Sequence, residues 1–282
     1  MVRHVDSCAL NTKGQQMHLR YITCSDPREF NDIHDVVKLA QLSPRVEIAV
    51  QAHPSKMSPG MPRNEWFREL LQYVIRDKYN INLAVHVNRE WCEKICRKGQ
   101  IPQELKEFFG LRTENNKPLI KRWQLNVPSY TVPDINYRAL KRMFNKNSQN
   151  EFIVQYNAHT KDVATTLYAM NVRFSVLYDA SGGRGISPEL WNAPLWTFVS
   201  QGYSGGLSPE NVESNLDKIS KVAVYPFARY DKNNNIVRSV EMRKDIWVDA
   251  EGKLKTDDKF DILRAQQYVL NVEHWLTKQK QK

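Results

Sequence analysis

Two glycine-rich segments in the last third of the sequence have the character of anion-binding loops. They are Asp179–Gly185 and Gly202–Asn211, and in the second Pro209 and Glu210 mark the start of a helix. Glycine lets the backbone take positive φ and approach a ligand closely, and a helix N-terminus adds free N–H donors. The alternative is a pair of tight turns. We expect these two segments to form a phosphate site.

Three carboxylates follow β-rich runs and are candidates for acid–base chemistry. Asp179 ends one run directly before the first glycine segment, where it could act as a general acid or base. Its alternative role is to cap the following turn. Asp249 and Glu251 end the last run, and could either contact a substrate or orient a loop.

Further polar residues lie at the ends of other β-rich runs and suggest a polar, anion-seeking pocket. Arg89 among them could hold a carboxylate through two parallel hydrogen bonds. Each residue alone could instead serve a structural hydrogen bond. The set comprises His53, His86, Arg89, Asn126, Gln155 and Asn157.

The sequence predicts neither a metal nor a cofactor. Cys92 and Cys96 are four residues apart on an expected helix, without a partner at zinc-binding spacing, and are interpreted as ordinary thiols. No Walker loop, nucleophile elbow or His-Glu-x-x-His motif occurs.

These residues must be positioned by an alternation of strands and helices. Eight short β-rich runs predict strands. They cover Leu19–Cys24, Val46–Gln51, Ile81–Val87, Ile120–Val127, Phe152–Tyr156, Phe174–Tyr178, Thr197–Ser200 and Ile246–Val248. Eight β-α units favour a closed (β/α)8 barrel over an open doubly wound sheet. The open sheet would carry its glycine fingerprint after the first strand, where this chain has Ser25-Asp26-Pro27.

Helices are expected between the runs. Capping signals place their starts at Asp26 and Asn64, and others cover Arg89–Arg97, Tyr137–Phe144, Thr160–Met170, a segment from Ser208, and Asp258–Leu276. Residues 18–282 would form one barrel after an N-terminal extension, 1–17. An insertion at 220–245 would form a hairpin of Val222–Tyr230 and Ile236–Val240.

The last third resembles the phosphoribosylanthranilate isomerase family. The resemblance covers Phe174–Val269 and is carried by Leu-Tyr-Asp before Gly-Gly-x-Gly, by Gly-Gly-Leu-Ser-Pro-Glu-Asn-Val at Gly205–Val212, and by Val-Asp-x-x-Gly. That family is a (β/α)8 barrel that rearranges an N-linked ribose phosphate with a cysteine base and an aspartate acid. The resemblance implies Asp179 as the acid, and it implies phosphate contacts at Gly182, Gly183, Gly185, Gly205 and Gly206.

The first strand departs from the family's pattern. Matching Ile22-Thr23 to the family places Arg20 where the cysteine belongs, whereas matching strand ends places Cys24 near it. A thiol needs a lowered pKa to act as a base. Under the alignment of strand ends, Cys24 is the candidate base. The alignment on Ile22-Thr23, which places Arg20 there, stays open.

The composition limits the class of protein without choosing its partner. The net charge is +10, and such an excess attracts phosphorylated metabolites, nucleic acid or acidic surfaces alike. No apolar N-terminal segment or membrane-length run occurs, and four cysteines in 282 residues suit a reducing compartment, so we expect a cytoplasmic protein. The sequence does not indicate an oligomeric state.

Three functions remain after these observations. The first is an isomerase-like enzyme acting on a phosphorylated (amino-)ribose metabolite. The second is a barrel that binds a phosphorylated metabolite without turning it over. The third is a nucleic-acid-associated protein that uses the basic segment Arg229–Lys244, with Tyr225, Phe227 and Tyr230 stacking on bases.

Overall fold

The structure is a computed structural model that describes residues 18–179, 181–182, 184–196, 198–230, 236–243 and 245–281. Within 224–243 it describes the backbone alone. The expected N-terminal extension, 1–17, lies outside these residues, as does Gly183.

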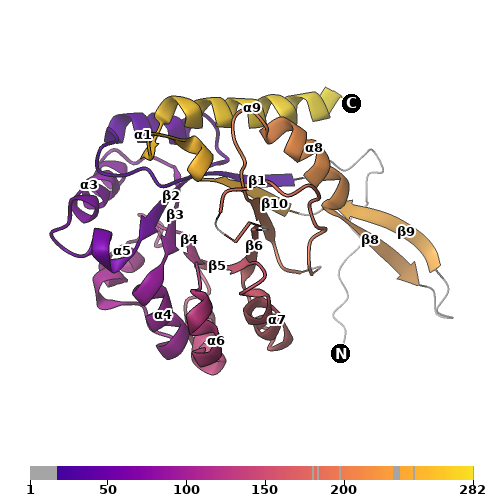
Figure 1. Cartoon of the computed structure of the whole chain (residues 1–282), viewed down its shortest axis with the longest axis horizontal. Coiled ribbons are helices and arrows are strands. Elements are labelled where there is room, and N and C mark those ends of the chain that lie inside the picture. The colour runs from indigo at the N-terminus through magenta and orange to yellow at the C-terminus, as the bar shows by residue number, and fades with distance from the viewer. Residues whose placement is uncertain are drawn as a thin grey trace.

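Eight parallel strands close into a barrel, as the sequence predicts, which excludes the open sheet (Figure 1). The order around the barrel is β1-β10-β7-β6-β5-β4-β3-β2. The strands are β1 (His18–Ser25), β2 (Val46–Ala52), β3 (Asn82–Val87), β4 (Arg122–Leu125), β5 (Glu151–Tyr156), β6 (Ser175–Asp179), β7 (Gln201–Ser204) and β10 (Asp245–Ala250).

Helices surround the barrel, and their apolar faces cover the outward side chains of the strands (Figure 1). They are α1 (Ile33–Gln41), α2 (Pro54–Met57), α3 (Pro62–Arg76), α4 (Arg89–Lys98), α5 (Lys106–Gly110), α6 (Tyr137–Lys146), α7 (Lys161–Ala169), α8 (Val212–Val222) and α9 (Ile262–Gln281). Short 3-10 helices cover Gln103–Leu105, Ser129–Asp134 and Gly252–Leu254, and β11 (Lys255–Thr256) pairs with β12 (Lys259–Phe260).

Two boundary predictions were wrong for identifiable reasons. The seventh strand is Gln201–Ser204, not Thr197–Ser200. This strand is short and contains Gly202. A Cβ at that position would lie 2.1 Å from the Trp247 ring, so the packing requires glycine, a residue of low strand propensity. The first helix is capped by Asp32, whose side chain accepts from the N–H groups of His34 and Asp35. Asp26 instead has φ 77° and lies buried beside two arginines.

The connection from β6 to β7 departs from the regular β-α alternation. Its described residues, 181–182, 184–196 and 198–200, contain no helix. Trp191 is buried and donates from Nε1 to Asn215 Oδ1 of α8, while Trp196 stacks on Tyr168 of α7. Aromatic contacts thus anchor an irregular segment to its neighbouring helices.

The inside of the barrel holds an arginine between two aromatic rings. Arg122 is 1% exposed, with its guanidinium 4.4 Å from the centre of the Tyr21 ring and 4.3 Å from that of Trp247. Its Nη1 lies 2.6 Å from Glu47 Oε1, and its Nε lies 3.6 Å from Glu151 Oε2. Aromatic faces and carboxylates together compensate a charge that burial would otherwise make costly.

The expected hairpin precedes the last barrel strand. β8 (Val224–Tyr230) pairs antiparallel with β9 (Ile236–Arg243), and the pair projects from the barrel beside α8 (Figure 1). The side chains on which the nucleic-acid hypothesis depends, Tyr225, Phe227 and Tyr230, lie outside the described ones.

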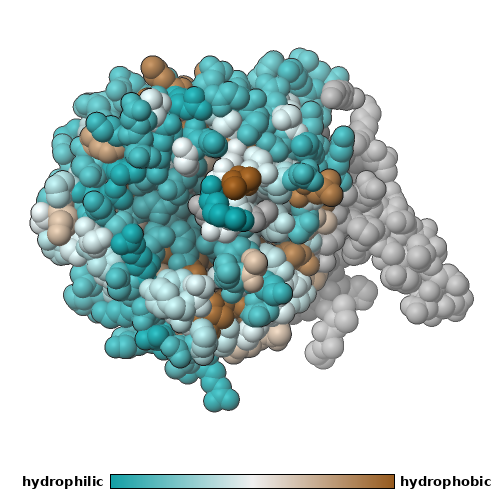
Figure 2. Space-filling view, in the orientation of Figure 1, coloured by the Kyte–Doolittle hydropathy of each residue, from teal (hydrophilic) through white to brown (hydrophobic). Residues whose placement is uncertain are grey.

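The face of the molecule in Figure 2 is mostly hydrophilic, with hydrophobic residues scattered over it. In the described part of the chain, no helix has the length and apolar character needed to cross a membrane.

Candidate functional site

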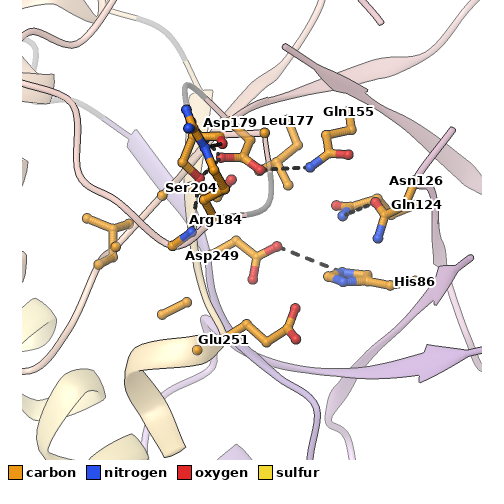
Figure 3. Close-up of a pocket in the computed structure, with 18 of the residues that line it drawn as sticks. His86, Gln124, Asn126, Gln155, Leu177, Asp179, Arg184, Ser204, Asp249 and Glu251 are labelled. Carbon is orange, nitrogen blue, oxygen red and sulfur yellow. Dashed lines mark hydrogen bonds and ion pairs between the residues drawn. The ribbon is translucent and has the colours of Figure 1, made fainter. Parts of the chain in front are cut away.

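A cavity of about 400 Å³ opens at the carboxyl ends of the barrel strands. Parallel strands bring their following loops together at this end, where α/β barrels place their active sites. The cavity gathers most of the residues that the sequence singled out (Figure 3). They are His86, Asn126, Gln155, Asp179, Gly182, Gly185, Gly205, Gly206, Asp249 and Glu251.

Cys24 does not reach this cavity. Its neighbours Thr23 and Ser25 bond to Glu47 and Asp249, so the alternation of the strand turns Cys24 to the other face. There it is fully buried in the core between strands and helices, and burial raises the pKa of its thiol. A thiol in this setting is a poor base, so we leave Cys24 out of the proposed chemistry.

His53, Arg89 and Asn157 do not line the cavity either. His53 hydrogen-bonds Ser55 Oγ at 3.0 Å, and Arg89 is exposed at the start of α4. Asn157 accepts from the N–H groups of His159 and Thr160 and so caps the turn before α7. The side chain of Asn157 thus makes structural hydrogen bonds within its own loop, which is the alternative role considered for it.

The two glycine segments meet at the edge of the cavity. Gly182 and Gly185 have φ 61° and 66°, and no atom lies within 4 Å of a Cβ built on either. Gly206 has φ 63°, and a Cβ there would lie 2.4 Å from the backbone nitrogen of Ser187. The first two glycines therefore border open space, whereas Gly206 lets one loop pack on the other.

Gly206→Ala is expected to destabilise the protein by about 1–3 kcal/mol, since strain at positive φ adds to a backbone clash. Gly182→Ala is the matched control, with nearly the same φ and no clash, and is expected to cost about 1 kcal/mol. Urea denaturation of both variants measures the difference. Equal losses would show that the contact with Ser187 is unimportant.

Asp179 is held in one orientation by its own loop and the neighbouring strand. Its Oδ1 accepts from Ser181 Oγ at 2.7 Å and from Ser181 N at 3.1 Å, and its Oδ2 accepts from Gln155 Nε2 at 2.8 Å. The residue is 4% exposed. A carboxylate fixed in this way is prepared for one approach direction of a ligand.

Asp249 is the second buried carboxylate of the cavity. Ser25 Oγ donates to its Oδ1 at 2.7 Å, and its Oδ2 lies 3.9 Å from His86 Nε2. Burial, with a smaller effect of the Asp179 charge, raises the pKa of Asp249 to about 6. Its acid and base forms are therefore both populated near neutral pH.

His86 lies on β3 and is 3% exposed. Burial lowers its pKa to about 4, despite the opposing influence of Glu251 and Glu47. The imidazole is therefore neutral at physiological pH, and it can donate from one ring nitrogen and accept at the other.

Sequence reasoning missed a group of amides and two cations. Gln51, Asn88 and Gln124 line the cavity, and so do Arg184 and Lys253. Strand pairing places Gln51 beside His86, and His86 beside Gln124. A polar residue inside an otherwise apolar strand was the available signal for the two glutamines, because its side chain must face a polar interior.

Comparison with known proteins adds little to this geometry. No protein-family model and no curated protein matches the sequence. Among solved structures, N-(5'-phosphoribosyl)anthranilate isomerase from Pyrococcus furiosus is similar at 12% identity and a TM-score of 0.45, over 91% of this chain and 100% of that one. A likeness at this level carries no argument about the site.

Proposed function

We propose that this chain is an enzyme of the isomerase type that acts on a phosphorylated (amino-)ribose metabolite. The observation that carries the proposal is that open glycines and two buried carboxylates line one cavity. One wall has open positive-φ glycines, Gly182 and Gly185, beside Arg184. Two buried carboxylates, Asp179 and Asp249, share the cavity with them.

The glycine wall suits a phosphate group. The N–H groups of Gly182 and Gly185 donate to Asp179 O and Ser181 Oγ, so these glycines give a phosphate room to approach while the guanidinium of Arg184 supplies a charge of the right sign. Ser204 also lines this side of the cavity and can donate a hydroxyl hydrogen bond.

The carboxylates suit proton transfer on the sugar. In an isomerisation, one group takes a proton from carbon while another gives a proton to oxygen, and no second substrate is consumed. Asp249 can play either part, because its pKa is about 6. Asp179 would be its partner, as the general acid.

Solvent deuterium exchange tests the proposal. Ribose 5-phosphate or phosphoribosylanthranilate would be incubated with the protein in D2O, and incorporation at sugar carbon 2 followed by NMR. We expect exchange with the wild type and a decrease of about 10²–10⁴-fold in Asp179→Asn and Asp249→Asn. Cys24→Ala, which alters a thiol outside the cavity, is expected to retain the wild-type rate.

The principal alternative makes a different prediction. A barrel that only binds phosphorylated metabolites would bind ribose 5-phosphate and show no exchange. It would also lose none of that affinity in Asp249→Asn.

A further inference from the structure

The cavity wall across from the glycine segments is a chain of hydrogen-bonded amides, which we call the amide chain. Gln124 Nε2 donates to Asn126 Oδ1 at 2.9 Å, and Asn126 Nδ2 donates to Asn88 Oδ1 at 2.9 Å. Asn88 Nδ2 then donates to Gln51 Oε1 at 2.6 Å, and Gln51 Nε2 to Glu251 Oε2 at 2.8 Å. Figure 3 shows Gln124 and Asn126 on the side of the cavity opposite Asp179, Arg184 and Ser204.

The direction of the amide chain is fixed at two points. A carboxylate can only accept, so Glu251 requires the NH2 group of Gln51 to face it. The backbone oxygen of His86 accepts from Asn88 Nδ2 at 2.8 Å, which fixes that amide independently. Each remaining amide must then be oriented in turn, with its oxygen toward the donor that precedes it.

The first amide of the chain, Gln124, therefore has an oxygen that accepts no hydrogen bond from the described residues. Gln124 is 2% exposed, and its Oε1 has no hydrogen-bond partner among the described residues. A buried acceptor without a partner lowers the stability of the protein. A ligand that brings an O–H or N–H group to this position recovers that free energy.

The rest of this side has no features that would favour an aromatic acid. The described residues that line the cavity include no Phe, Tyr or Trp, and their apolar members are Leu177, Leu207 and Ala250. Arg184 and Lys253 are exposed. Beside the amide chain a ligand carboxylate would meet Glu251, and the nearby cation Lys255 is already paired with Glu251 and Asp26.

We propose that the non-phosphate half of the ligand is a hydroxyl-rich group, such as a second sugar or a polyol, and not an aromatic carboxylate. This rests on the proposed function, because the phosphate is taken to lie on the glycine segments. A hydroxyl donates and accepts at once, so it satisfies Gln124 Oε1 and can also take the second N–H of a neighbouring amide.

Two matched pairs of ligands test this proposal on the wild-type protein. Trehalose 6-phosphate adds a second sugar to glucose 6-phosphate, and phosphoribosylanthranilate adds an aromatic carboxylate to ribose 5-phosphate. Dissociation constants would be measured by thermal-shift titration, with inorganic phosphate as the reference. We expect the second sugar to tighten binding at least tenfold and the anthranilate group to give no gain.

Gln124→Leu is expected to abolish the gain from the second sugar while leaving the affinity for inorganic phosphate unchanged. Gln103→Leu, on an exposed 3-10 helix, is the matched control and should keep the gain. Because the wild-type comparison needs no variant, poor folding of Gln124→Leu would not remove the test.

The outcomes separate this inference from the function on which it rests. Tighter binding or turnover of phosphoribosylanthranilate would overturn the inference and support the isomerase. A wild-type protein that binds neither inorganic phosphate nor any sugar phosphate would overturn both.

Discussion

Arg122→Met is expected to destabilise the barrel by about 3–5 kcal/mol, the usual loss when one partner of a buried ion pair is removed. The substitution would leave Glu47, 1% exposed, and Glu151 inside the barrel without their shared cation. Methionine keeps much of the side-chain volume between Tyr21 and Trp247, so the loss reports mainly on charge.

Urea denaturation of Arg122→Met, Glu47→Gln and the double variant measures this effect as a cycle. The double variant should lose less than the sum of the single losses, since it leaves fewer unpaired charges. Arg76→Met is the control: Arg76 pairs with Asp77 at 2.7 Å on the surface, and we expect only a small change in the free energy of unfolding. A loss of that small size at Arg122 would contradict the argument.

Asp249→Asn is expected to stabilise the folded protein at pH 7.5 by about 3 kcal/mol while it removes exchange activity. Burial raises the pKa of Asp249 from 3.8 to about 6, so the folded state binds this proton more tightly than the unfolded state does. The aspartate therefore favours folding below pH 3.8. This contribution to the free energy of unfolding decreases as the pH rises from 3.8 toward 6, and it is fully lost above pH 6.

Urea denaturation at pH 7.5 and pH 4.0 checks the sign and the pH range. The gain in the variant should fall below about 1 kcal/mol at pH 4.0, because the wild-type carboxyl is then protonated in the folded state. Asparagine can still accept from Ser25 at the same position. Asp245→Asn, which alters a carboxylate exposed beside His18, should show no comparable gain. A gain that is independent of pH would contradict the assignment.

Much of the fold was predictable because strands and helices are encoded locally. Runs such as Val46–Ala52 are buried along almost their whole length, as strands covered on two sides are. The helix expected over Arg89–Arg97 is α4, and Gly99 ends it in the left-handed conformation that favours glycine. The seventh strand could not be predicted, because glycine is required at position 202 by the ring of Trp247. Trp247 lies 45 residues away in the sequence but beside Gly202 in the barrel.

The site was predictable where a residue's role depends on its position at a strand end. Asp179, Asp249 and His86 reach the cavity for this reason. The position of Cys24 could not be predicted, because successive side chains of a strand point to opposite faces. An irregular pairing between Leu19 and Tyr21 shifts this alternation and turns Cys24 away from the cavity. The amide chain could not be predicted, because it depends on the register of β2, β3 and β4 together.

The β8–β9 hairpin and the cavity lie at opposite ends of the barrel, so the sequence of one can change without altering the other. The hairpin leads into β10 at Asp245, the amino-terminal end of the strand, whereas the cavity residues Asp249 and Glu251 lie at its other end. Additions at the amino-terminal end of a barrel leave the loops that do chemistry untouched. The hairpin is thus a suitable graft point for a reporter or an affinity handle, and a place where a new surface could arise without altering the cavity.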